Sequence, residues 1–86
     1  NKVEPLSLIA FDTEVFAMGT YPTENIEEYQ ILLDSNAKTG HFKKLYFKED
    51  ELVYGVLFKD ISKASVLLTG VRNGDDYATV VSKLYR

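Results

Sequence analysis

Residues 42 to 60, FKKLYFKEDELVYGVLFKD, constrain the fold most, because they read as two strands joined by a charged turn. The aromatic and β-branched residues of this stretch suit a pleated sheet. Successive side chains of a strand alternate between the two faces of its sheet. One face of the first strand therefore carries Lys43, Leu45 and Phe47, and the other carries Phe42, Lys44, Tyr46 and Lys48.

The second strand of this hairpin, residues 52 to 58, reads LVYGVLF and has little polar content on either face. A strand of this kind is typically covered on both sides, so we predict that it lies at the centre of the sheet. Glu49, Asp50 and Glu51 interrupt the apolar pattern with three like charges. Such charges are tolerated only in water, so we place the turn at the surface.

Three further strands are expected before this hairpin. Residues 7 to 11 and 14 to 18 are short apolar runs separated by Asp12 and Thr13, which predicts a first hairpin, because Asp tolerates left-handed turn geometry. Residues 26 to 34, IEEYQILLD, lie between two loops and have one apolar face, which favours a third strand. Two turns of helix remain the alternative for this segment.

One or two helices are expected after the hairpin. Asp60 stands where an N-cap would, and Ser62 is the competing cap. Asn73-Gly74 supplies a left-handed end, and Asp75 and Asp76 favour a second helical start. The predicted apolar positions are Ile61, Ala64, Leu67, Leu68 and Val71 in the first helix, and Tyr77, Val80, Val81 and Leu84 in the second.

These elements predict an α+β fold, an antiparallel sheet of about five strands followed by one or two C-terminal helices packed on it. The 86 residues allow one domain spanning 1–86, and 45% of them are hydrophobic. The chain lacks cysteine, which excludes disulfides and fits a reducing, cytoplasmic compartment. Its net charge of −3 disfavours nucleic acid as a partner, and no apolar run approaches the length needed to span a bilayer.

Catalytic and cofactor motifs are missing from the sequence. It contains no GxGxxG, no P-loop and no CxxC, and His41 is its only histidine. The paired carboxylates Glu27-Glu28 and the run 49 to 51 are read as solvated faces, because neighbouring side chains of a strand point to opposite sides. No nucleophile and base can be paired from these residues, so we assign no catalytic residue and rank a stand-alone enzyme last.

A local basic patch accompanies an aromatic residue on the fourth predicted strand. Lys44 and Lys48 bracket Tyr46 on one face, and this surface could meet an acidic partner protein despite the negative net charge. The alternative is that the lysines keep a sheet edge soluble. A self-contained protein-binding module that uses Lys44, Tyr46 and Lys48 is therefore one functional hypothesis.

The order of residues over about 7 to 74 resembles a known family. The stretch from Lys43 to Gly74 is similar to the C-terminal domain of FAD-dependent pyridine nucleotide-disulfide oxidoreductases, especially NADH:rubredoxin reductases and the large subunit of NADH-dependent nitrite reductases. Residues 9 to 19, IAFDTEVFAMG, resemble the family's first hairpin. The matching positions are Lys44-Leu45, Leu52-Val53, Val56-Leu57, Asp60, Ala64 and Val71-Arg72-Asn73-Gly74, with Phe16 and Gly19 in the hairpin.

The chain departs from the family pattern at three places. It has Asp12 where the family often has a turn Gly, Tyr54-Gly55 where Gly-Ala is usual, and Lys59 in place of the Gly before Asp60. A backbone-dependent ligand contact is not expected at these positions.

The resemblance implies that the chain, which begins at Asn1, is an excised C-terminal domain of a larger flavoprotein. The parent would bind FAD and NAD(P)H in two preceding domains and pass electrons from nicotinamide through flavin to a redox acceptor, for instance an acidic protein. This domain would pack against those FAD- and NAD-binding domains as an accessory and interface domain. It would bind no cofactor or metal itself and would not be catalytic alone, and no family site residue transfers to it.

Overall fold

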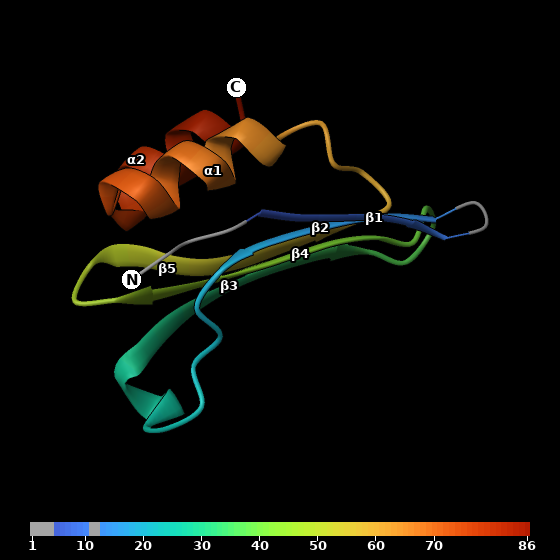
Figure 1. The fold of residues 1–86 in the computed structure, drawn as a ribbon. Coiled ribbons are helices and arrows are strands. Elements are labelled where there is room, and N and C mark those ends of the chain that lie inside the picture. Colours follow the sequence, from blue (N-terminus) through green and yellow to red (C-terminus); the bar gives the residue numbers. More distant parts are fainter. Residues whose placement is uncertain (1–4, 11–12) are drawn as a thin grey trace.

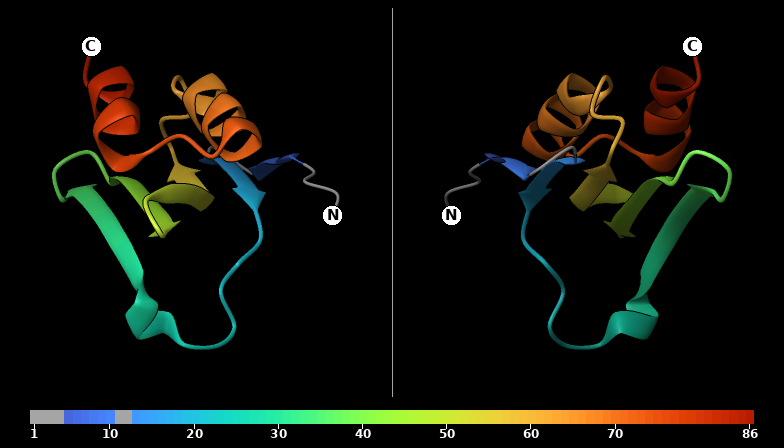
Figure 2. Two further views of the ribbon diagram at one scale, coloured as in Figure 1. Left: turned by 90° about the vertical axis from the view of Figure 1, so that its left-hand side faces the viewer. Right: turned by 90° about the vertical axis from the view of Figure 1, so that its right-hand side faces the viewer.

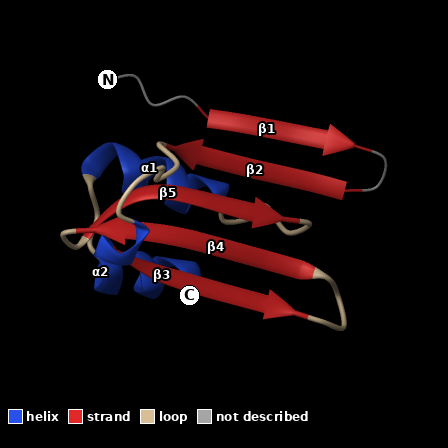
Figure 3. Cartoon of the chain, turned by 90° about the horizontal axis from the view of Figure 1, so that it is seen from below, coloured by secondary structure: helices blue, strands red, loops and turns tan. Residues whose placement is uncertain are grey.

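The computed structural model describes residues 5–10 and 13–86, which form one antiparallel five-stranded sheet with two helices on one of its faces (Figure 1). The predicted α+β fold is confirmed. The strands lie in the order β1-β2-β5-β4-β3, and neighbouring strands are antiparallel throughout (Figure 3). The elements are β1 Pro5–Ala10, β2 Thr13–Gly19, the short 3-10 helix η1 Ile26–Glu28, β3 Tyr29–Asn36, β4 His41–Lys48, β5 Glu51–Phe58, α1 Ala64–Asn73 and α2 Tyr77–Leu84.

The strand β5 is central, as predicted, and it contains a β-bulge. The register of β4 against β5 shifts between Tyr46 and Phe47: Phe47 opposes Leu52, whereas Tyr46 opposes Tyr54. Val53 is therefore the extra residue on β5. An extra residue rotates the strand's alternation by one step, so Leu52 is buried toward the helices while Tyr54 points to the opposite face.

The turn between β4 and β5 is short and exposed, as predicted. Glu49 and Asp50 both have positive φ, 53° and 61°, which is the geometry that matches the twist of two antiparallel strands. The Asp50 carboxylate also accepts a hydrogen bond from the Tyr77 N–H at 3.1 Å. This bond ties the tip of the hairpin to the first residue of α2.

The hydrophobic core lies between the sheet and the two helices. Leu45, Leu57 and Leu67 are fully buried there. α1 packs close to β5 because Gly55 has no side chain: a Cβ at this position would lie 2.7 Å from Leu67 Cδ2. The buried apolar residues of this core are Phe16, Met18, Leu45, Phe47, Leu52, Leu57, Leu67, Val80 and Leu84.

The predicted start of the first helix is wrong. α1 begins at Ala64, its N-cap is Lys63, and no side chain caps it. The Asp60 carboxylate instead accepts hydrogen bonds from the Ser62 N–H at 3.0 Å and the Ser62 hydroxyl at 2.7 Å. Both proposed caps are thus bonded to each other in the loop, where short polar side chains readily form such local turns. Ile61 still packs against the core, although it precedes the helix.

The ends of the helices follow the sequence more closely. Gly74 has a φ of 65° at the C-terminus of α1, which is the left-handed end predicted from Asn73-Gly74. Asp76 caps α2, and its carboxylate accepts from the Thr79 N–H at 2.8 Å. The Thr79 hydroxyl and N–H hold the pKa of Asp76 below its ordinary value.

The third strand is shorter at its start than predicted. Residues 26 to 28 form η1, and β3 begins at Tyr29 and continues through Asn36. Neither a full strand over 26 to 34 nor a two-turn helix is correct, because Asn25 adopts a left-handed conformation, φ 54°, that starts a single turn. The first hairpin is confirmed by the antiparallel pairing of β1 and β2, and its predicted turn residue Asp12 lies outside the described residues.

The prediction that residues 52 to 58 are covered on both sides is wrong. The helices cover only one face of the sheet, and β3 with the connection that leads to it curves away on the other side (Figure 2). Tyr54, Val56 and Phe58 are half-buried on that second face. These apolar side chains lie on a surface of the sheet that no helix and no second sheet of the described chain covers (Figure 2).

Candidate functional site

The residues predicted as a partner surface, Lys44, Tyr46 and Lys48, lie together on the sheet face opposite the helices. We call this surface the open face. The cross-strand pairs define its members, because directly opposed residues of antiparallel strands share a face. The open face comprises Val15, Ala17, Tyr29, Ile31, Leu33, Phe42, Lys44, Tyr46, Lys48, Tyr54, Val56 and Phe58.

Four tyrosines form a cluster at one end of the open face. Tyr46 lies at its centre, with ring centroids 5.6 Å from Tyr21, 5.8 Å from Tyr54 and 6.4 Å from Tyr29. Tyr21 and Tyr54 are 5.3 Å apart, and all four pairs meet edge to face, an arrangement that aromatic rings favour. Tyr46 is only 3% exposed, whereas Tyr21 is 56% exposed. Within the cluster, Tyr21 is therefore exposed to solvent and Tyr46 is not.

The loop after β2 brings Tyr21 to this cluster. Gly19 ends β2 with a φ of 109°, and the Thr20 N–H then donates to the carbonyl of the bulge residue Val53 at 2.9 Å. Pro22, next to Tyr21, is buried. The bulge on β5 thus anchors the loop that covers Tyr46.

Sequence reasoning found Tyr46 but missed the other three tyrosines. Tyr54 reaches the open face only because of the bulge, since a regular register would place it on the same side as Leu52. Tyr21 lies in a loop, where strand alternation makes no prediction. Tyr29 was assigned to the right strand, and its pairing with Lys48 was the one signal that could have placed it beside the patch.

The lysines of the open face are held against these rings. Lys44 Nζ lies 5.3 Å from the centroid of Tyr46, and Lys48 Nζ lies 5.6 Å from that of Tyr29. Lys48 is also 3.6 Å from the Glu28 carboxylate, which offsets its charge. Lys43 belongs to the other face, where it contacts Asp34 at 3.7 Å and the Tyr85 ring. Lys44 is thus the main positive charge of the open face.

Charge and burial act in opposite directions on Tyr46. Burial raises the pKa of its phenol, but the Lys44 ammonium and the Tyr21 hydroxyl favour the phenolate, and the pKa is lowered overall. The same contact with Tyr46 raises the pKa of Lys44. The contact therefore favours the cationic form of Lys44 beside the Tyr46 ring.

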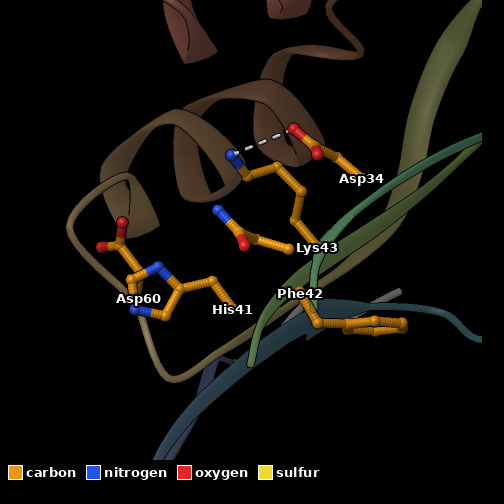
Figure 4. Close-up of a pocket in the computed structure, with 6 residues that line it drawn as sticks. Asp34, His41, Phe42, Lys43 and Asp60 are labelled. Atoms are coloured by element: carbon orange, nitrogen blue, oxygen red, sulfur yellow. Dashed lines mark ion pairs between the residues drawn. The ribbon is translucent and has the colours of Figure 1, made fainter. Parts of the chain in front are cut away.

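A separate polar hollow of about 160 Å³ lies where the β3–β4 turn meets the loop after β5 (Figure 4). It contains His41, which the sequence marked as the only histidine. The Ser62 hydroxyl and N–H hold the pKa of the neighbouring Asp60 below its ordinary value. His41 itself is exposed, and Lys43 is paired with Asp34. The lining residues are Asp34, Asn36, His41, Phe42, Lys43 and Asp60.

Two features that often mark a metal or polar centre are missing from residues 13–86. Within that range, no group of three His, Asp or Glu side chains is placed to hold a metal ion. The same residues leave no buried side-chain polar atom without a hydrogen-bond partner. The acidic runs Glu27-Glu28 and Glu49–Glu51 are exposed, as predicted.

Comparison with known proteins gives no relative: no family model, no curated protein and no solved structure matches the chain. Among the described helices, none combines the length and apolar character needed to cross a membrane.

Proposed function

We propose that this chain is a non-catalytic docking domain, the C-terminal accessory domain of a cytoplasmic FAD-dependent NAD(P)H oxidoreductase. Its open face packs against the flavin-bearing body of the parent enzyme, whose preceding domains hold FAD and NAD(P)H. The observation that carries the docking role is the open face itself, an apolar and aromatic surface built from the cross-strand pairs and the tyrosine cluster. It lies on the side of the sheet away from both helices (Figures 1 and 2).

Exposure of large apolar side chains supports an interface. Tyr21 is 56% exposed, Ile31 41% and Leu33 58%, and all three lie on or beside the open face. Contiguous apolar patches of this kind on small domains mark protein contacts, because water disfavours them. Tyrosine is also enriched at the centre of protein interfaces, since its ring buries a large area and its hydroxyl retains a polar contact.

Backbone geometry at glycine positions supports the flavoprotein family. The family pattern places Gly at five positions of this chain. Asp12 lies outside the described residues, and Tyr54 has no positive φ. The other three positions are Gly19, Lys59 and Gly74. Their φ angles are 109°, 75° and 65°, a region that favours glycine over any residue with a side chain. Lys59 keeps the glycine-type conformation although it has replaced the glycine, as expected if the chain has diverged from this pattern.

The test of this proposal is the native polypeptide that contains the segment, purified from its source. We expect a protein several times the length of this chain, with a flavin absorbance spectrum that NADH or NADPH bleaches. A colourless polypeptide of about this length would contradict the flavoprotein assignment.

The role of the open face is tested in the same flavoprotein. Tyr21→Lys puts a charge at the most exposed tyrosine of the cluster, and burying it in an interface is unfavourable. We expect faster proteolytic release of the domain or faster hydrogen exchange on β4 and β5. The matched control is Ser65→Lys on the exposed side of α1, which should change neither the rate of proteolytic release nor the rate of hydrogen exchange. Equal behaviour of the two variants would show that another surface docks.

A self-contained module that binds an acidic protein is the second candidate function. It is favoured by one observation: within the described chain, Lys44 forms no ion pair, and its ammonium lies beside the tyrosine cluster. The double change Lys44→Glu with Lys48→Glu should abolish such binding, while Lys38→Glu in the exposed β3–β4 turn should not. Unchanged association with every candidate partner would end this hypothesis.

A further inference from the structure

We propose that β3 is a self-association strand, which pairs antiparallel with β3 of a second copy of this chain to make one sheet continuous across both copies. This inference concerns the backbone edge of the sheet and does not rest on the proposed function, although Ile31 and Leu33 belong both to this edge and to the open face. The two copies would leave both open faces on the same side and accessible.

The outer edge of the sheet at β3 lacks the features that normally prevent strand pairing. β3 is the last strand in the order β1-β2-β5-β4-β3 and extends over eight residues, YQILLDSN. It pairs with β4 from Tyr29 to Asn36 without a register shift, so it contains no β-bulge. Its sequence contains no proline and no lysine, the residues that most often protect an edge strand.

Two large aliphatic side chains are exposed on this edge. Ile31 is 41% and Leu33 is 58% exposed, and both lie on the open face. Leu32, between them, packs against the core on the helix side. The strand therefore presents an unpaired backbone edge together with apolar side chains that a neighbouring strand would cover.

The single charge of β3 is already engaged within its own chain. Asp34 accepts a hydrogen bond from the Tyr85 hydroxyl at 2.5 Å and lies 3.7 Å from Lys43 Nζ. These contacts hold the carboxylate on the helix side of the sheet. The strand has no free charge that would repel an identical strand.

A two-fold axis midway between Leu32 of one copy and Leu32 of the second copy gives a self-complementary register. Ile31 then opposes Leu33 of the second copy, and the pair occurs twice by symmetry. Gln30 opposes Asp34 of the second copy, so no like charges face each other. This register also keeps open-face residues opposite open-face residues, as a continuous sheet requires. An identical strand therefore fits this edge, and we infer a second copy rather than a foreign strand.

The first test measures the mass of the chain by sedimentation equilibrium as its concentration is raised to the millimolar range. The chain mass is 9.8 kDa, and we expect the mass to approach twice this value. Leu33→Glu should keep the chain monomeric, because it would place a carboxylate in the apolar pair. In its own chain the new Glu opposes Lys44, which favours the monomer fold. Thr69→Glu, at an exposed position of α1, makes the same charge change, and the chain that carries it should still dimerise.

The second test reads out the register. The chain has no cysteine, so single introduced thiols report without background. An oxidised mixture of Ile31→Cys and Leu33→Cys should form a disulfide between the two variants. Each variant alone should not, because identical positions lie two residues apart along the paired strands, about 7 Å, beyond disulfide reach.

Three results would overturn the proposal. These are a single-chain mass over the whole concentration range, a dimer that Leu33→Glu and Thr69→Glu leave equally intact, and disulfides that form as readily within each single variant as in the mixture. If Leu33→Glu unfolds by circular dichroism, the cysteine mixture still decides the question. A dimer without this register would assign the contact to another surface, whereas loss of self-association has no bearing on docking to a flavoprotein.

Discussion

Gly19 is the residue on which the geometry of the open face most depends. Its φ of 109° ends β2, and its Cα lies so close to the bulge that a Cβ would be 2.1 Å from the Val53 carbonyl oxygen. The neighbouring backbone cannot retreat, because that carbonyl accepts the Thr20 N–H. Glycine is required here both for its conformation and for its size.

We predict that Gly19→Ala lowers the free energy of unfolding by more than about 3 kcal/mol, since it adds a backbone clash to conformational strain. Chemical denaturation measures this. Gly40→Ala is the matched control: Gly40 also has positive φ, 80°, but its Cβ would meet only the flexible end of Lys59. Gly40→Ala should cost about 1–2 kcal/mol. Equal losses would mean that the contact with Val53 is not rigid.

Lys59 is the reverse case of Gly19, because a residue with a side chain adopts a φ of 75°, a conformation that favours glycine. We predict that Lys59→Gly raises the free energy of unfolding by about 0.5–1 kcal/mol, as relief of left-handed strain exceeds the added chain entropy. Lys63→Gly, at φ −101°, is the control and should give no gain. Thermal denaturation of the two variants distinguishes them, and destabilisation by Lys59→Gly would contradict the assignment of strain.

At the scale of elements, the end of α2 is joined to the edge strand by one polar contact. The Tyr85 hydroxyl donates to the Asp34 carboxylate on β3. Burial and the adjacent carboxylate raise the pKa of Tyr85 to about 12 from its ordinary 10. The folded state therefore holds the phenolic proton more tightly than the unfolded state, so this contribution to stability is complete below pH 10 and is lost as pH rises toward 12.

We predict that Tyr85→Phe is less stable than the parent chain at neutral pH, by no more than about 1 kcal/mol, because the residue is 52% exposed and solvent screens the contact. The difference should shrink between pH 10 and 12. Urea denaturation at a series of pH values measures it. Asp34→Asn removes the neighbouring anion and should also flatten the alkaline loss, and a constant difference across this range would contradict the linkage.

Several of the elements and their ends could be predicted from the sequence. The β4–β5 hairpin, the central place of β5, the C-terminal end of α1 at Asn73-Gly74 and the start of α2 follow from alternation and turn chemistry. The bulge at Val53 does not follow in this way. It allows the loop after Gly19 to bond to β5 and Leu52 to face the helices, and both requirements are set by distant parts of the chain. Tyr54 was missed for that reason and Tyr21 because it lies in a loop. Asp60 was misassigned because its bond to Ser62 competes with capping.

At the scale of the whole molecule, the two faces of the sheet contribute differently to stability. The helix face buries Leu67 completely, against Gly55 and Leu45, whereas the open face exposes Tyr21. We predict that Leu67→Ala lowers the free energy of unfolding by about 2–5 kcal/mol. Tyr21→Ala should cost about 1 kcal/mol, the value of its edge-to-face contacts. Guanidinium denaturation gives both values, and equal losses would mean that the open face is also core.

The extra residue in β5 also governs how the length of this chain can vary. Removal of Val53 would make Leu52 and Tyr54 neighbours in a regular hairpin, and they would still point to opposite faces. The change would remove the Val53 carbonyl, which accepts the Thr20 N–H and anchors the loop that carries Tyr21. Residues 37 to 40, in the exposed turn between β3 and β4, have no such role. Deletions in that turn should therefore be tolerated, whereas deletion of Val53 should release the loop that covers Tyr46.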